Sequence, residues 1–150
     1  MGTLKIADAP FVLTTAGIGS CVALCMFHAQ TKKGALAHIM LPVRPEAANA
    51  TSYTEEDLRY ADAAIKVIIS QFSTMGVSAS ALVAKLVGGA SMFPEIQGRS
   101  VRVGEKNVES IKALLGTYSI RIVGEDVGGS VGRAASFDLS SGVVQVRTSL

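Results

Sequence analysis

The stretch from Ala9 to Thr31 constrains the fold of this chain most, because it contains no Asp, Glu, Lys or Arg. An apolar run of that length could cross a bilayer as a helix. Thr14-Thr15, Gly17 and Gly19-Ser20 interrupt it, however, so short apolar segments alternate with small and polar residues. The pattern therefore predicts two short strands and a turn, and we expect no membrane insertion.

The rest of the chain alternates strand and helix signals. Apolar residues recur at helical spacing over residues 55–75 and about 105–115, and Ser52 with Glu55 or Thr54 with Asp57 could form a capping box before the first helix. Strands are expected at residues 11–15, 21–27, 35–41, 81–87, 118–123, 133–138 and 142–148. This order predicts an α/β fold of the α+β sandwich kind. In it, mixed β-sheets with β-hairpins pack against two main helices, in a single domain of residues 1–150.

Composition narrows the choice of partner and compartment. The net charge is only +2, the basic residues are scattered and the chain has no Trp, so we expect no nucleic-acid partner. Asp8 and Pro10 interrupt the segment where a signal peptide would need its apolar core. Two cysteines are too few for a disulfide framework in a domain of this size. We therefore expect reduced thiols and a cytoplasmic protein.

Cys21 and His38 are the candidate reactive pair. Cys21 follows the glycine-rich turn, and a thiol with an ordinary pKa of about 8.5 needs a neighbour to ionise it at neutral pH. Residues 28–34 predict a hairpin centred near residue 31, which would place His38 about three positions from the cross-strand partner of Cys21. The two could act as nucleophile and base. A structural cysteine that enters a strand is the alternative, and the spacing alone leaves it open.

A metal or cofactor site is the main rival interpretation. Cys21, Cys25, His28 and His38 are four potential zinc ligands. On a strand, however, four residues span about 13 Å, so the two sulfurs cannot share one ion. We therefore expect no metal, with Cys25 in the core and His28 solvated at the hairpin turn. Gly88-Gly89 lacks the Lys-Ser/Thr pair of a phosphate-binding loop, and no cofactor is expected.

Met92-Phe93-Pro94 places two large apolar side chains in a glycine-flanked loop. Scattered apolar residues of this kind are normal and usually fold back onto the core. The alternative is an exposed anchor for a protein partner, which makes Met92 and Phe93 candidate partner-binding residues.

Several motifs, in order along the chain, resemble those of the CheD family of chemoreceptor glutamine deamidases. The first two surround the candidate pair: Gly17-Ile18-Gly19-Ser20-Cys21-Val22 and Gly34-Ala35-Leu36-Ala37-His38-Ile39-Met40-Leu41-Pro42. The likeness continues through residues 59–64, 84–92, 104–109 and 124–129. Together these segments cover nearly the whole chain, and their order is far more specific than one Cys-His spacing.

The resemblance implies a fold similar to that of deamidating toxins and a protein that converts selected chemoreceptor glutamines to glutamates. Carried over by motif, it makes Cys21 the nucleophile, His38 the base and Thr15 the third member of a Cys-His-Thr group. Gly19 and Ser20 precede the nucleophile, where backbone N–H groups would stabilise an oxyanion. The implied partners are methyl-accepting chemoreceptors as substrate and the CheC phosphatase. A non-catalytic binding module for CheC is the alternative.

Overall fold

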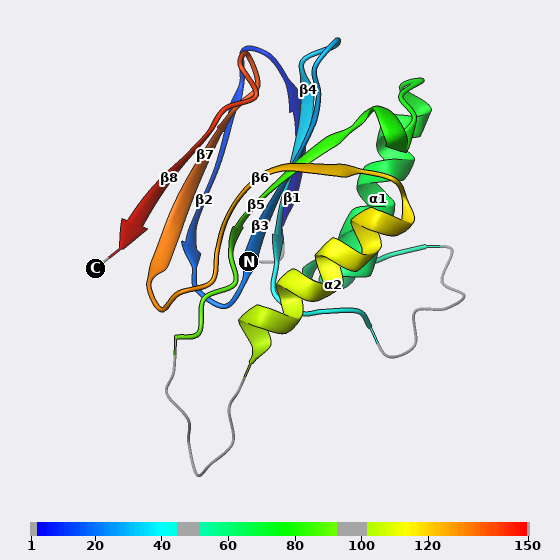
Figure 1. Ribbon diagram of the computed structural model, residues 1–150. Helices are drawn as coiled ribbons and strands as arrows, with labels where there is room; N and C mark the ends of the chain where they lie inside the picture. Colours follow the sequence, from blue (N-terminus) through cyan, green and yellow to red (C-terminus); the bar gives the residue numbers. More distant parts are fainter. Residues whose placement is uncertain (1–2, 45–51, 93–101, 150) are drawn as a thin grey trace.

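The computed structural model describes residues 3–44, 52–92 and 102–149, which form three layers (Figure 1). A five-stranded sheet lies in the middle, two helices cover one of its faces, and a three-stranded sheet lies against the other. This arrangement confirms the expected α+β fold of mixed sheets and two main helices. No helix among these residues combines the length and the apolar content needed to cross a membrane.

The central sheet has the strand order β1-β4-β3-β5-β6. Its strands are β1 (Leu4–Asp8), β3 (Val22–His28), β4 (Lys33–Ile39), β5 (Val83–Gly88) and β6 (Arg121–Val127). The expected hairpin is formed by β3 and β4, and Ala23 pairs with His38 in it. Because β5 and β6 pair in parallel and the other neighbours are antiparallel, the sheet is mixed. The sequence pattern did not predict β1, whose five residues are too few for a clear alternation.

The three-stranded sheet contains β2 (Val12–Ile18), β7 (Gly132–Asp138) and β8 (Val144–Ser149), with β7 at its centre. The strands before and after the glycine-rich turn therefore belong to different sheets. Residues 19–21 carry the chain across from β2 to β3, and Cys21 lies in this crossing. The expected C-terminal hairpin is confirmed as β7 and β8.

The first predicted helix is divided in two, which corrects its expected start. A 3-10 turn, η2 (Glu56–Arg59), is followed by Tyr60 in an extended conformation, and α1 (Ala61–Thr74) begins only after it. Of the two proposed capping boxes, the second forms: Thr54 N donates to Asp57 Oδ2 at 2.8 Å, and Asp57 N donates to Thr54 Oγ1 at 3.4 Å. A further 3-10 turn, η3 (Ala79–Ala81), precedes β5. The second helix, α2 (Val103–Thr117), is about two residues longer at each end than predicted.

Two apolar cores hold the layers together. The core between the helices and the central sheet includes Leu24, Ile65, Ile68, Phe72, Leu86 and Ile111. The core between the two sheets includes Leu13, Ala23, Cys25, Leu36, Val87 and Phe137. Burial of one Leu or Phe side chain contributes about 1.5–3 kcal/mol. The second core therefore holds β2 against the central sheet, and the site described next depends on this packing.

Candidate functional site

The two sheets bring Thr15 and His38 into contact. His38 pairs with Ala23, which belongs to the core between the sheets, so the imidazole faces the three-stranded sheet. Thr15, on β2, meets it there: Thr15 Oγ1 and His38 Nδ1 are hydrogen bonded at 2.8 Å. The contact joins residues 23 positions apart and lies between the layers rather than along one strand.

The imidazole of His38 is almost fully enclosed, with 3% of its surface exposed. Burial disfavours the charged ring and lowers the pKa of His38 below its ordinary value. The other ring nitrogen, Nε2, is buried and has no hydrogen-bond partner among the described residues. His38 is therefore a neutral imidazole at neutral pH, and the nitrogen that does not contact Thr15 is available to a further group.

The two cysteines differ sharply in environment. Cys21 is partly exposed at the crossing between the sheets, and its neighbour Val22 pairs with Ile39, the residue after His38. Burial raises the pKa of the Cys21 thiol above its ordinary value, so Cys21 is also neutral at rest. Cys25 is buried in the core between the sheets, as expected, and burial raises its pKa to about 12. Only Cys21 can present a thiol to an outside molecule.

A glycine turn after β5 supports the backbone of the nucleophile segment. Gly89 N donates to Cys21 O at 2.7 Å, and Ala90 N donates to Gly19 O at 2.9 Å. Gly88 has a φ of +119°, and a Cβ on it would collide with the Cys21 carbonyl oxygen. The Gly88-Gly89 pair, rejected as a phosphate loop, thus has a structural role directly behind Cys21.

Sequence reasoning missed two buried polar side chains near this segment. Asn107, on α2, donates through Nδ2 to Ser20 O and to Met40 O, at 3.0 Å each. Arg133, on β7, donates through Nη1 to Gly88 O at 3.4 Å and pairs through Nη2 with Asp126 at 3.2 Å. Both could have been suspected, because each is a polar residue at an inward position of its element. Asn107 continues the buried stripe of α2, and Arg133 lies on the same inward face of β7 as the buried Ala135 and Phe137.

Other candidate residues occupy different places. His28 is not solvated as expected: it is buried at the end of β3, and its Nδ1 is hydrogen bonded to Thr31 Oγ1 at 2.7 Å. Met92 is 41% exposed and lies against Gly19, where an added Cβ would be 3.1 Å from Met92 Cγ. Phe93 lies outside the described residues. Within the described part of the chain, no group of three His, Cys, Asp or Glu side chains could hold a metal ion.

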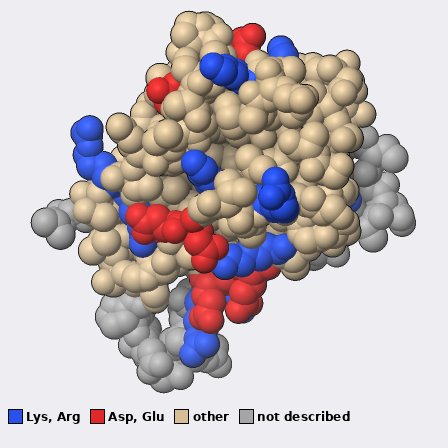
Figure 2. All heavy atoms as spheres, turned by 45° about the horizontal axis from the view of Figure 1, so that its top comes forward, with Lys and Arg blue, Asp and Glu red and all other residues tan. Residues whose placement is uncertain are grey.

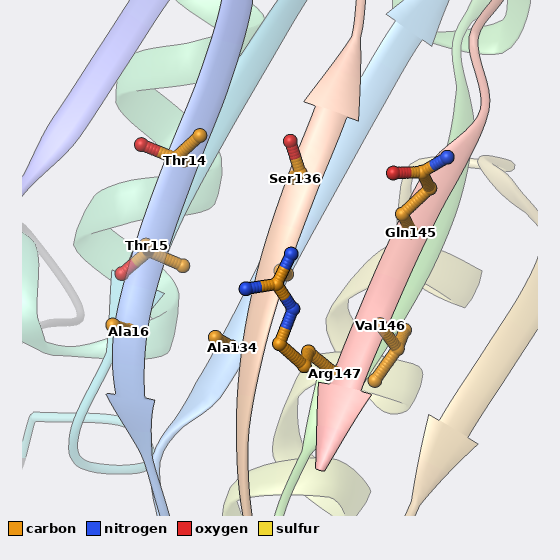
Figure 3. Close-up of a pocket in the computed structure, with 9 residues that line it drawn as sticks. Thr14, Thr15, Ala16, Ala134, Ser136, Gln145, Val146 and Arg147 are labelled. Carbon is orange, nitrogen blue, oxygen red and sulfur yellow. The ribbon is translucent and has the colours of Figure 1, made fainter. Parts of the chain in front are cut away.

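A wide hollow lies on the outer face of the three-stranded sheet, and Thr15 contributes to its lining. It has a volume of about 690 Å³, and Figure 3 shows Thr14, Ser136, Gln145 and Arg147 along it. These side chains point away from the core between the sheets, and His38 does not line the hollow. On the face shown in Figure 2, Lys and Arg lie among Asp and Glu, so its described residues form no broad basic patch.

Taken together, the fold and the site define a class: an α+β protein of two packed sheets, with a hydrogen-bonded His38–Thr15 pair between them and the partly exposed Cys21 in the connection from one sheet to the other. No hydrogen bond joins Cys21 to His38 among the described residues. Comparison with known sequences is more specific, and the chain belongs to the CheD family. The sequence model of that family, described as CheD chemotactic sensory transduction, matches residues 40–148.

Relatives extend the match to the N-terminal part that holds Thr15, Cys21 and His38. The chain is 38% identical over 150 residues to the probable chemoreceptor glutamine deamidase CheD of Syntrophomonas wolfei, covering 99% of this chain and 90% of that protein. It is 35% identical over 147 residues to the chemoreceptor glutamine deamidase CheD of Thermotoga maritima, covering 98% and 88%. A probable chemoreceptor glutamine deamidase CheD of Archaeoglobus fulgidus is also 35% identical, with 99% and 90% covered.

Proposed function

We propose that this protein deamidates glutamine side chains of chemoreceptors, through a thioester on Cys21. The observation that carries the proposal is the contact between Thr15 and the buried His38. The partly exposed Cys21 directly precedes Val22, which pairs with Ile39, the residue after His38. Membership in the CheD family, and the activity in the names of relatives that cover almost the whole chain, support the choice of substrate.

The first half of the reaction transfers the glutamine acyl group to sulfur. His38 Nε2 takes the proton of the Cys21 thiol as Sγ attacks the carboxamide carbon, because both groups are neutral at rest. The imidazolium then gives that proton to the departing nitrogen, which leaves as ammonia. In the second half, neutral His38 removes a proton from water, and the hydroxide attacks the thioester. The products are a glutamate side chain and the restored thiol, and no cofactor takes part.

Thr15 orients the imidazole in this scheme. When Nδ1 carries the ring proton, it donates to Thr15 Oγ1, and Nε2 keeps the lone pair that accepts the thiol proton. A hydroxyl supplies less charge stabilisation to the imidazolium than a carboxylate would. Thr15 therefore contributes mainly by fixing the tautomer and the plane of the ring.

The developing oxyanion would be held by backbone N–H groups of the segment Gly19-Ser20-Cys21. The carbonyls of this segment are already occupied, since Gly19 O, Ser20 O and Cys21 O all accept hydrogen bonds from residues behind it. These bonds support a fixed orientation of the N–H groups, which stabilisation of a tetrahedral intermediate requires.

The two cysteines of the chain provide a matched test. Purified protein is incubated with a cytoplasmic chemoreceptor fragment, and released ammonia is measured for the wild type, Cys21→Ala and Cys25→Ala. The proposal predicts that Cys21→Ala is folded and inactive, while Cys25→Ala keeps its activity and loses only some stability from a small cavity. Ammonia release by Cys21→Ala at the wild-type rate would refute the proposal.

A second candidate function is a binding module for the CheC phosphatase, favoured by the exposure of Met92 directly beside Gly19. In that case Met92 and Phe93 would anchor the partner, and Cys21 would be dispensable. Binding of CheC by Cys21→Ala, and its loss in Met92→Glu or Phe93→Glu, would support this function alongside or instead of catalysis. We place either function in the cytoplasm, because the two unpaired cysteines suit a reducing compartment.

A further inference from the structure

Asn107 joins the two segments that carry the proposed nucleophile and base. Its side chain is fully buried, and its Nδ2 lies 3.0 Å from both Ser20 O and Met40 O. Ser20 immediately precedes Cys21, and Met40 follows His38 by two residues. One amide group on α2 therefore ties together, from the helix side of the central sheet, the two segments that hold Cys21 and His38.

We infer that Asn107 is a positioning residue for the proposed deamidation, because it aims the backbone N–H of Cys21 at the reacting oxygen. The inference rests on the proposed function. It does not place Asn107 in contact with substrate.

The geometry of the peptide unit supports this role. Ser20 C=O and Cys21 N–H belong to the same planar unit, and the only cis peptide among the described residues is Ala9-Pro10. In a trans unit the two groups point in opposite directions, so a carbonyl directed at Asn107 sends the Cys21 N–H away from α2. That N–H faces the sulfur of its own residue, and this contact lowers the pKa of the thiol against the larger opposing effect of burial. An N–H beside the nucleophilic sulfur is where an oxyanion donor must be.

The hydrogen bonds of Asn107 also strengthen the donor. A carbonyl that accepts a hydrogen bond polarises its peptide unit and makes the N–H of that unit a better donor. Both N–H groups of the amide are used for the two carbonyls, and its Oδ1 is buried with no partner among the described residues. An apolar side chain of similar size would leave no unpaired oxygen there. The hydrogen bonds that asparagine donates to Ser20 O and Met40 O are thus what an apolar side chain at this position could not supply.

The test compares Asn107→Ala and Asn107→Ser with Lys112→Ala, which removes the exposed ion pair between Lys112 on the same helix and Glu125 on β6. For each folded variant, kcat and KM are measured with the chemoreceptor fragment. Alkylation of Cys21 by iodoacetamide is followed against pH, with Cys25 replaced by Ala throughout. We expect Asn107→Ala to lose about tenfold or more in kcat with KM nearly unchanged, because the donor is misdirected rather than removed, and outright loss of an oxyanion donor costs about 10²–10³-fold. Asn107→Ser should lose less, and Lys112→Ala should match its Cys25→Ala background in both measurements.

The alkylation arm separates failure of the inference from failure of the proposed function. The pH at which Cys21 alkylation reaches half its maximal rate, the midpoint, should be higher in Asn107→Ala, because the Cys21 N–H no longer faces the sulfur. This measurement needs no deamidase activity. An unchanged kcat together with an unchanged midpoint in folded Asn107→Ala would overturn the inference. So would unfolding of both Asn107 variants, which would make the residue purely structural. A wild type that releases no ammonia would refute the proposed function, and the alkylation midpoint would then decide the role of Asn107 alone.

Discussion

At the scale of single residues, the proposed chemistry depends on two groups that both start uncharged. Burial holds the pKa of His38 below and that of Cys21 above their ordinary values, so a thiolate–imidazolium pair is not the resting state. The proton that must reach the departing ammonia is then the one that Cys21 carries at rest. Reactivity requires the neutral thiol and the neutral imidazole together.

This leads to a prediction for the pH dependence of kcat/KM. Protonation of His38 removes the base, and its lowered pKa places the acid limb below pH 6.5. Ionisation of Cys21 removes the proton needed by the leaving group, and its raised pKa moves the alkaline limb upward. We expect a broad plateau between the two limbs when initial rates are measured from acid to alkaline pH. An acid limb above pH 6.5 would contradict a His38 with a lowered pKa.

Thr15 and its neighbour Thr14 form a matched pair for a second prediction. Thr15→Ala removes the hydroxyl from His38 Nδ1, and a hydrogen bond to a group that becomes charged is worth about 1.5–3 kcal/mol. We therefore expect a loss of about ten- to hundredfold in kcat, which is less than the loss in Cys21→Ala, with recovery in Thr15→Ser. Thr14 is exposed on the outer face of the same strand, and Thr14→Ala should remain near wild type. Equal effects of Thr14→Ala and Thr15→Ala would contradict a specific role for the Thr15 hydroxyl.

At the scale of elements, the turn after β5 determines how closely the chain can approach Cys21. Gly88 combines a positive φ with a position where a Cβ would meet the Cys21 carbonyl and the Ile18 side chain. Gly89 then donates to that same carbonyl. The turn can therefore pack against the segment that carries Cys21 only if residue 88 is a glycine.

Chemical or thermal unfolding of two glycine variants tests this fit. Gly88→Ala should destabilise the fold by about 3 kcal/mol or more, since both strain and collision oppose it. Gly116, near the end of α2, has open space around its Cβ position, and Gly116→Ala should stabilise the protein by about 0.5–1 kcal/mol. A Gly88→Ala protein as stable as the wild type would show that the turn can shift away from Cys21.

The same elements show what the sequence could predict. The β3–β4 hairpin and the stripe of Ile65, Ile68 and Phe72 on α1 follow from local periodicity, and both are confirmed. The break at Tyr60 was not predicted, because Leu58 continues the apolar spacing of α1 toward the N-terminus. The backbone is nevertheless extended at Tyr60, between η2 and α1. Local pattern also could not assign β2 and β3 to different sheets. That depends on how distant strands pair, and β2 pairs with β7 from the far end of the chain.

The residues of the candidate site also fall into two groups, those that the sequence predicted and those that it did not. Cys21 and His38 stood out because their residue types carry chemistry and the hairpin brings their strands together. Asn107 and Arg133 did not, since their importance comes from contacts with backbone carbonyls of segments far away in the chain. Such contacts leave little trace in local sequence beyond a polar residue at an inward position.

At the scale of the whole molecule, the site exists only where layers meet. Thr15 comes from the three-stranded sheet, His38 from the central sheet and Cys21 from the connection between them, while Asn107 reaches this connection from the helix layer (Figure 1). Packing of both apolar cores is therefore a condition for the geometry of the site. The molecule holds its proposed reactive groups through the arrangement of layers rather than within one loop.

The most direct test of the central claim is mass spectrometry of a chemoreceptor cytoplasmic fragment incubated with the protein in H₂¹⁸O. Hydrolysis of a Cys21 thioester predicts glutamates in place of particular glutamines, each with one solvent ¹⁸O in its side chain, in wild type and Cys25→Ala but not in Cys21→Ala. An unchanged receptor in the presence of folded wild-type protein, or the same conversion by Cys21→Ala, would contradict the account.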